Sequence, residues 1–353
     1  MPTTLAHRQF RSAFCALILL CLSALSSFAA ATPTLYAILS GNIVSFKPDA
    51  PGTLLTNRPD VGTSDSARAI EIDPTTGHLY AMYQTSATSY GLRRINLSTG
   101  YVSDLSLFGT LTTTSAAAGV GVGLAYDPLA HGLRVITAAG DNFLISLATA
   151  QPSFYFSPPA YITGDTGFGI TPYIEHIAYT NAIPSPSTTT LYGIDTQRNV
   201  LVRVGTAGSP YSTQAYTVST FALGINPTDY GGFVIDPATN RAYAAMTVDG
   251  APRLYEVNLV TGVAIFLGQI GTSATARVEG LAAAPGVNHC LDIDGDGEIL
   301  AHRDGLMLTR IALGMTGSAV LANAIPTFNP PPRTTWAAIR THLVDRCGMT
   351  ITP

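Results

Sequence analysis

The residues with the clearest chemical potential lie in a short acidic stretch near the C-terminus. It reads DIDGDGE over residues 292–298 and is followed by Asp304. Carboxylates at alternate positions of a tight loop converge on one point, and hard oxygen ligands of this kind suit Ca²⁺. The expected ligands are the side chains of Asp292, Asp294, Asp296 and Asp304 and the backbone carbonyl of Glu298. The alternative is a solvated acidic turn that binds no ion.

A second, weaker set of candidates is spread along the chain. Its members are Arg68, Glu175, His176 and Glu279, with Glu71 as a further residue of the same kind. Arg68, His176 and Glu279 hold equivalent places relative to the turns of a sequence repeat, so they would meet if the repeats surround an axis. The sequence has no GxSxG, HExxH or phosphate-loop motif. A hydrated channel without chemistry therefore remains the alternative.

The elements that must position these residues are repeated. The segments AIEIDPTTGHLYAM (69–82), GLAYDPLAHGLRVIT (123–137) and GFVIDPATNRAYAAM (232–246) resemble one another. Their turn aspartates, Asp73, Asp127 and Asp236, are 54 and 109 residues apart, and a degenerate copy around Asn181 fills the longer interval. A period of this size in a β-rich chain indicates a strand unit repeated around an axis or along a solenoid.

Each unit combines two hairpins, because a second strand-and-turn motif such as LYEVNLVTG lies between the Asp-Pro turns. Four strands of this kind make one propeller blade. Complete units begin near residues 67, 121, 175 and 230, while 277–285 supplies one further strand and 35–57 supplies three. The sequence therefore predicts an all-β five-bladed β-propeller closed between its two ends. Six blades, or a sandwich of irregular hairpins, are the alternatives.

The domain organisation follows from changes in pattern along the chain. We expect a signal peptide at 1–31, the propeller at 32–286 and a small module at 287–353. The module contains two helical patterns, Asp304–Leu313 and Thr335–Val344, which prolines separate.

The first residues have the pattern of a secretory signal. Arg8 and Arg11 precede an apolar run over 14–25, and three alanines at 29–31 suit signal peptidase. This predicts a secreted protein, extracellular or periplasmic, with no stable membrane span after cleavage. A lipoprotein anchored through Cys21 is the alternative, although Leu20 is not the small residue that such a signal needs.

Charge and cysteine content limit the partners and the compartment. Without residues 1–31 the chain has 16 basic and 22 acidic side chains, a net charge of −6, and Lys47 is its only lysine. So few cations cannot neutralise many phosphates, which argues against nucleic acid as a partner. Cys290 and Cys347 remain after cleavage and are expected to form a disulfide in an oxidising compartment.

The C-terminal segment CLDIDGDGEILAHRDGLMLTRIALGMTG (290–317) resembles the dockerin-like calcium modules of many secreted bacterial proteins. In this chain the closing acid, Asp304, is thirteenth in the loop, and Arg303 holds the twelfth place. The segment NPPPRTTW, where a second loop belongs, has no acidic residue. The resemblance therefore implies a module with one ion and gives little support for a cohesin-like partner.

The repeat region is similar to a secreted bacterial family, domain-of-unknown-function family 4394. The segments GFVIDPATNRAYAAM, LYEVNLVTG and AYTN carry this resemblance, which covers about residues 35–285. It implies a repeated β fold and says almost nothing about activity.

Together these features favour a secreted, non-catalytic binding or structural protein. The propeller would recognise an extracellular glycan or protein, and the calcium module would serve an accessory or attachment role. Candidate contact residues are Tyr155, Tyr161, Tyr173 and Tyr230. The alternative is a hydrolase or lyase acting at the channel, which requires two of Arg68, His176 and Glu279 to reach a common point.

Overall fold

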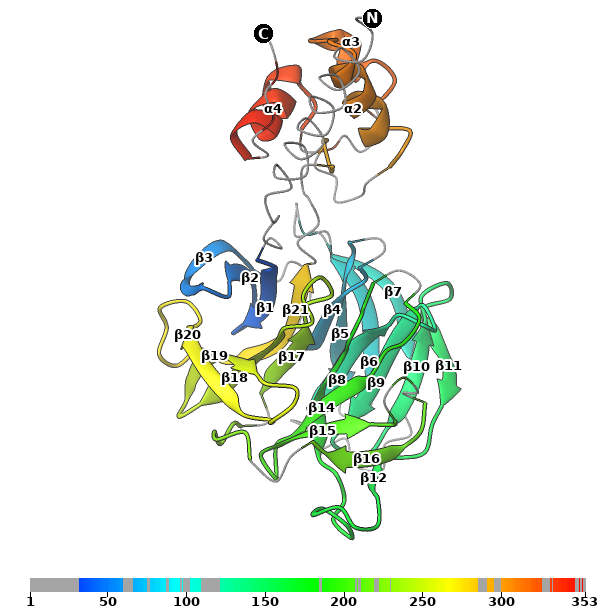
Figure 1. Ribbon diagram of the computed structural model, residues 1–353, viewed down its shortest axis with the longest axis vertical. Helices are drawn as coiled ribbons and strands as arrows, with labels where there is room; N and C mark the ends of the chain where they lie inside the picture. The colour runs from blue at the N-terminus through cyan, green and yellow to red at the C-terminus, as the bar shows by residue number, and fades with distance from the viewer. Residues whose placement is uncertain are drawn as a thin grey trace, which may run out of the picture. The chain divides into compact units, whose positions relative to one another are not determined.

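The structure is a computed structural model of the chain. It describes residues 32–351 except for gaps at 60–65, 75–76, 87–88, 96, 98–101, 109–120, 184–185, 207, 209–210, 219–221, 229, 285–290, 295–299, 326–330, 332, 347–348 and 350. The expected signal peptide and the two cysteines of the expected disulfide lie outside the described residues. The described part is mostly β, with a few short helices near the C-terminus (Figure 1).

The strands form five sheets, antiparallel except for one parallel pair in the third, which we number as blades in chain order. Blade 1 contains β4 (Ser66–Ile72), β5 (Leu79–Ser86), β6 (Ser89–Ile95) and β7 (Val102–Phe108). Blade 2 contains β8 (Val122–Asp127), β9 (Gly132–Thr137), β10 (Asn142–Ser146) and β11 (Gln151–Tyr155). Blade 3 contains β13 (Ile174–Tyr179), β14 (Leu191–Asp195), β15 (Val200–Val204), β16 (Gln214–Thr217) and a short β12 (Ala160–Tyr161). Blade 4 contains β17 (Gly231–Ile235), β18 (Ala242–Val248), β19 (Ala251–Val257) and β20 (Ala264–Gln269). Blade 5 contains β21 (Val278–Ala284), β1 (Thr34–Leu39), β2 (Asn42–Lys47) and β3 (Ala50–Pro59).

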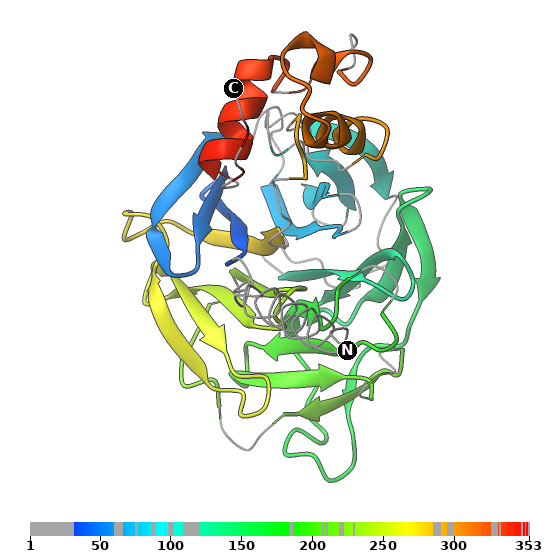
Figure 2. The same ribbon diagram turned by 45° about the horizontal axis from the view of Figure 1, so that its top comes forward.

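The blades surround a common axis, as Figure 2 shows. The innermost strands of the five blades are β4, β8, β13, β17 and β21, which contact one another in that order, with β21 returning to β4. Blade 5 is completed by antiparallel pairing of β1 with β21, from Thr34 opposite Ala284 to Leu39 opposite Val278. The predicted five-bladed propeller and its closure between the two ends are confirmed.

Small residues allow the innermost strands to pack closely. A Cβ atom on Gly232 of β17 would lie 2.1 Å from the backbone nitrogen of Leu281 on β21. Gly280 has a φ of 85° and would place a Cβ 2.8 Å from the backbone nitrogen of Ile70. Both positions therefore exclude any side chain, the second also because of its left-handed backbone.

The Asp-Pro turns are held by the aspartate side chains. Asp127 Oδ1 accepts hydrogen bonds from the backbone N–H groups of Leu129 and Ala130, each at 3.0 Å. The other carboxylate oxygen of Asp127 accepts from the Tyr179 hydroxyl of blade 3 at 2.9 Å. Local turn chemistry thus explains the aspartate at this turn, and at Asp127 the turn also joins two blades.

Blade 3 has one element that the repeat did not predict. Strand β12 pairs in parallel with β16, on the outer side of the blade. Its Tyr161 is buried and donates a 2.7 Å hydrogen bond to Asp195. The long connection between blades 2 and 3 provides this strand, and it follows no period.

The C-terminal helices are α2 (Asp304–Ala312), α3 (Ser318–Leu321) and α4 (Trp336–Thr341), followed by a π-helical turn over His342–Arg346. Both predicted helices are present, and the second changes from α to π geometry at His342. Their buried core consists of Ile293, Met307, Ile311, Val320, Ala324, Ile339 and Leu343. Of the helices in the described ranges, none has the length and apolar character to span a membrane.

Candidate functional site

Three of the predicted metal ligands meet in the structure. Asp292, Asp294 and Asp304 each place a carboxylate oxygen within 4.8 Å of the others. Their residues are 8 %, 0 % and 2 % exposed, so the group is buried although it is formed by a loop. Asp296 and Glu298, the other two expected ligands, lie outside the described residues.

The side chain of Asp304 is fixed by the loop that it closes. Its Oδ1 accepts hydrogen bonds from the backbone N–H groups of Ile293 at 2.6 Å and Asp294 at 3.3 Å. Its Oδ2 accepts from the N–H of Leu300 at 2.9 Å. Asp304 is also the first residue of α2, so the acid in thirteenth position reaches back to the start of the loop.

Arg333 supports the same loop from outside and was not predicted. Its backbone N–H donates to the carbonyl of Asp294 at 2.8 Å, and its Nε donates to the carbonyl of Ile293 at 2.8 Å. Its Nη2 donates to the carbonyl of Asp292 and lies 3.8 Å from Asp292 Oδ1. A single arginine in the acid-free segment NPPPRTTW was the only sequence signal.

The group has the chemistry of a hard-cation site. Three carboxylates at this separation repel one another, and a divalent ion among them would relieve that repulsion. A carboxylate has about four acceptor positions, and the backbone uses three of those on Asp304. The arrangement can therefore hold a metal ion, and its donor set is compatible with calcium.

The weaker candidates lie around the axis, at a level where three innermost strands are irregular. The ladder skips Arg68 in β4, Glu175 in β13 and Gly280 in β21. Each of these residues is the extra residue of a β-bulge, and bulges redirect neighbouring side chains. The other two innermost strands have no irregularity in their pairing at this level.

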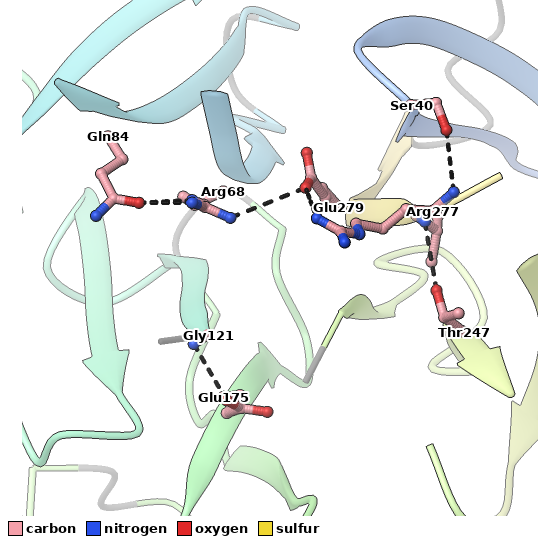
Figure 3. A network of polar contacts seen from close by, with 9 residues as sticks. Ser40, Arg68, Gln84, Gly121, Glu175, Thr247, Arg277 and Glu279 are labelled. Carbon is pink, nitrogen blue, oxygen red and sulfur yellow. Dashed lines mark hydrogen bonds and ion pairs between the residues drawn. The ribbon is translucent and has the colours of Figure 1, made fainter. Parts of the chain in front are cut away.

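Arg68 and Glu279 come together at the beginning of the innermost strands (Figure 3). Arg68 Nε and Nη2 donate to Gln84 Oε1 at 2.9 and 2.6 Å, which leaves Nη1 facing Glu279 Oε1 at 3.9 Å. Arg277 Nη1 lies 3.9 Å from the same oxygen, and its guanidinium carbon is 3.8 Å from the ring centroid of Tyr230. We call Arg68, Tyr230, Arg277 and Glu279 the channel mouth. Burial raises the pKa of Glu279, and the two arginines oppose that effect.

Glu175 does not join the channel mouth. Its residue is 0 % exposed, and its two oxygens accept from the backbone N–H of Gly121 at 3.1 Å and the hydroxyl of Thr196 at 2.8 Å. These bonds link β13 to the neighbouring blade and to the end of β14, as the lower part of Figure 3 shows for Gly121. Both of these hydrogen bonds are structural.

His176 lies beside a small cavity on the axis. The cavity has a volume of about 10 Å³, and Gly231, Gly280 and Ile70 also line it. This is room for about one water molecule. His176 Nε2 is buried and has no hydrogen-bond partner among the described residues. Burial lowers the pKa of His176 to about 4, so the imidazole is neutral at pH 7.

Glu71 lines a second cavity of about 10 Å³, together with Pro74, Tyr126, Tyr179 and Pro237. Its Oε1 accepts from the N–H of Ile72 at 2.8 Å. Burial raises the pKa of Glu71 to about 8. Glu71 lies near the end of β4, whereas Arg68 of the channel mouth lies near the start of the same strand. Glu71 is therefore not part of the channel mouth.

An enzyme at the channel would require two of Arg68, His176 and Glu279 to reach a common point, and one pair among the described residues does so. Arg68 and Glu279 face a common point, and no contact among the described residues connects His176 to that point. Of the candidate tyrosines, Tyr155 is 66 % exposed and Tyr161 is buried. Tyr173 and Tyr230 are half-buried, and Tyr230 packs under Arg277.

The profile of one protein family, described as "Domain of unknown function (DUF4394)", matches residues 42–282. The chain belongs to this family. The match covers all five blades in part or in full and confirms the resemblance seen in the repeat motifs. No curated protein matches the sequence.

Several solved structures align with this chain at low identity. TolB from Acinetobacter baumannii aligns with a TM-score of 0.40 and 11 % identity, over 72 % of this chain and 67 % of that one. A GH43 glycoside hydrolase with an engineered active site aligns with a TM-score of 0.41 and 11 % identity, over 69 % of this chain and 51 % of that one. A Bacteroides thetaiotaomicron protein of unknown function aligns with a TM-score of 0.40 and 11 % identity, over 73 % of this chain and 66 % of that one. This chain spans about half of the hydrolase and two thirds of the others, and likenesses this weak carry no argument about activity.

Proposed function

We propose that this protein is an exported, non-catalytic binding protein with one calcium ion in its C-terminal module. The observation that carries the calcium site is the group of carboxylates of Asp292, Asp294 and Asp304 within 4.8 Å of one another. Export is supported by the basic, apolar and small-residue pattern of residues 1–31. The dockerin-like character of the module is supported by the motif at 290–317.

In this proposal calcium joins the start of the acidic loop to the first residue of α2. Asp296 and the Glu298 carbonyl complete the ligands, while Arg333 and the backbone hold the loop in shape. A Cys290–Cys347 disulfide ties the two ends of the module together. An ion and a disulfide suit a module with so small an apolar core.

The propeller supplies the recognition surface. The closed ring of blades is a rigid support for the binding residues. The channel mouth combines two guanidinium groups with one carboxylate. The ligand is an extracellular glycan or protein rather than a nucleic acid, because the mature chain has a net charge of −6. A hydrolase or lyase is the less favoured function, since the cavity behind the mouth admits about one water.

Calcium titration by calorimetry tests the proposal. The mature protein is expected to bind one Ca²⁺, and Asp294→Ala is expected to abolish that binding because it removes a buried ligand. Asp249→Ala is the matched control, since Asp249 is an exposed aspartate of the propeller that pairs with Arg253. Absence of calcium binding, or equal binding by Asp294→Ala, would contradict a calcium site in this loop.

A further inference from the structure

We propose that the channel mouth binds two hydroxyl groups of a saccharide, through Arg68, Arg277 and Glu279. This inference rests on the proposed binding role of the propeller and assigns it a site and a ligand class. The three side chains come from blade 1 and from the start of β21, so only the closed ring brings them together.

The spacing of the charged groups leaves room for ligand oxygens. Arg68 Nη1 and Glu279 Oε1 are 3.9 Å apart, which is too long for a direct hydrogen bond. An oxygen that accepts from the guanidinium at about 2.9 Å and donates to the carboxylate at about 2.7 Å would complete a triangle with an angle of roughly 90° at that oxygen. A hydroxyl group can both accept and donate in this way.

The same geometry occurs a second time at the same carboxylate oxygen. Arg277 Nη1 is also 3.9 Å from Glu279 Oε1. Two bridging oxygens would therefore both contact one atom of Glu279, one on the side of each arginine. Oxygens that share a partner lie close enough to belong to one molecule, as neighbouring hydroxyl groups of a saccharide do.

The position of Glu279 beside both guanidinium groups favours a hydroxyl group over an anionic group at the bridging positions. Glu279 would repel an anionic group placed between the arginines, whereas a hydroxyl uses the donors and the acceptor together. The side chains of Arg68 and Glu279 are 15 % and 13 % exposed, and that of Arg277 is 52 % exposed, so a ligand can reach them from solvent. Because the cavity beyond them has about 10 Å³, a sugar ring would remain at the mouth.

The side chains are held in place before a ligand arrives. Gln84 fixes the guanidinium of Arg68 through two hydrogen bonds, and the ring of Tyr230 supports Arg277. The bulges at Arg68 and Gly280 set the direction of Arg68 and Glu279. Such preorganisation lowers the entropy cost of binding.

Saturation-transfer difference NMR with the methyl glycosides of glucose, galactose and mannose tests the site on the mature protein. We expect at least one glycoside to bind, and Glu279→Gln to weaken it by about tenfold or more, because each bridging hydroxyl loses its charged acceptor. Arg277→Met should weaken binding similarly, and since Arg277 is half-exposed this variant threatens the fold least. Glu256→Gln is the matched control, because Glu256 pairs with Arg241 on the outer part of blade 4.

Two results would overturn the assignment. One is that none of the three glycosides binds, or that binding persists unchanged in both Glu279→Gln and Arg277→Met. The other is that glycerol binds as well as the best glycoside, which would reduce the site to a general polyol or water site. Calorimetry on the same samples measures calcium binding by the acidic loop independently of glycoside binding. Loss of glycoside binding at the mouth and absence of calcium binding in the loop are therefore distinguishable.

Discussion

Arg134 is the one exception at a position where the other blades have tyrosine. The equivalent residues in the second strand of each sequence unit are Tyr36, Tyr80, Tyr192 and Tyr243. Arg134 is 0 % exposed, its guanidinium carbon is 3.3 Å from the ring centroid of Phe156, and its three nitrogens have no hydrogen-bond partner within the described part of the chain. A buried cation without hydrogen bonds is costly.

We therefore expect Arg134→Tyr to raise the melting temperature by roughly 1–2 °C, measured by calorimetry, which corresponds to about 1 kcal/mol in a protein of this size. The nearby Asp127 keeps its hydrogen bonds from two backbone N–H groups and from Tyr179. Blade 4 already combines a buried turn aspartate, Asp236, with a tyrosine at this position. Arg134→Lys is the comparison, since it keeps the charge without the planar stacking and should lower the melting temperature. A lower melting temperature for Arg134→Tyr would show that Asp127 needs the cation.

Glu71 should make the stability depend on pH. Its pKa rises from the usual 4.5 to about 8 on folding. As pH increases from 4.5, the unfolded chain loses this proton first, so the free energy of unfolding falls until about pH 8 and the effect then levels off. Glu71→Gln should remove that part of the decline and be more stable than the wild type at pH 8, as measured by urea unfolding at pH 5, 6.5 and 8. An identical decline in both proteins would exclude Glu71 as its source.

At the scale of the element, the turn chemistry was predictable and the bulges were not. The turns were predictable at Asp73, Asp127 and Asp236, because aspartate followed by proline favours a tight turn. Counting back from these turns made Arg68 and His176 equivalent. The structure separates them, because Arg68 is the extra residue of one bulge while Glu175, not His176, is the extra residue of the other. A bulge adds one residue without a composition signal, so periodicity alone does not place it.

In the acidic loop, too, some contacts could be predicted from the sequence and others could not. The alternation of Asp292 and Asp294 predicted convergence, and Asp304 does reach them. The support from Arg333 was not predictable, since it lies 39 residues beyond Asp294 and contacts backbone carbonyls, which have no sequence pattern.

Close packing of β17 against β21 provides a test at the same scale. Gly232→Ala would place a Cβ 2.1 Å from the backbone nitrogen of Leu281, and a backbone atom cannot rotate away. We expect the free energy of unfolding to fall by about 3 kcal/mol in chemical denaturation. Gly52→Ala is the matched control, because its Cβ would have no neighbour closer than 3.7 Å. If both variants were equally stable, the innermost strands would be less tightly packed than described.

At the scale of the whole molecule, the expected boundary near residue 287 predicts two unfolding events. In the proposed function the module depends on a calcium ion and on a Cys290–Cys347 disulfide, and closing that 57-residue loop would contribute about 4 kcal/mol. Reduction together with calcium chelation should therefore unfold residues 288–353 while the propeller remains folded. Hydrogen exchange with mass spectrometry would show full exchange in peptides of the module and retained protection in β13 and β17. Reduction alone and chelation alone are the controls, each with a smaller effect, and one concerted transition would contradict separate folding units.

The pairing of β1 with β21 also governs when the protein can finish folding. Thr34 and Ala284 are neighbours in the sheet but 250 residues apart in the chain. At about 5–20 residues per second, a ribosome needs roughly 12–50 s to make the partner of the first strand. During that interval β1 keeps an open edge, and contacts this distant in sequence slow folding further. The newly made chain must therefore be protected from pairing with its copies until its last propeller strand arrives.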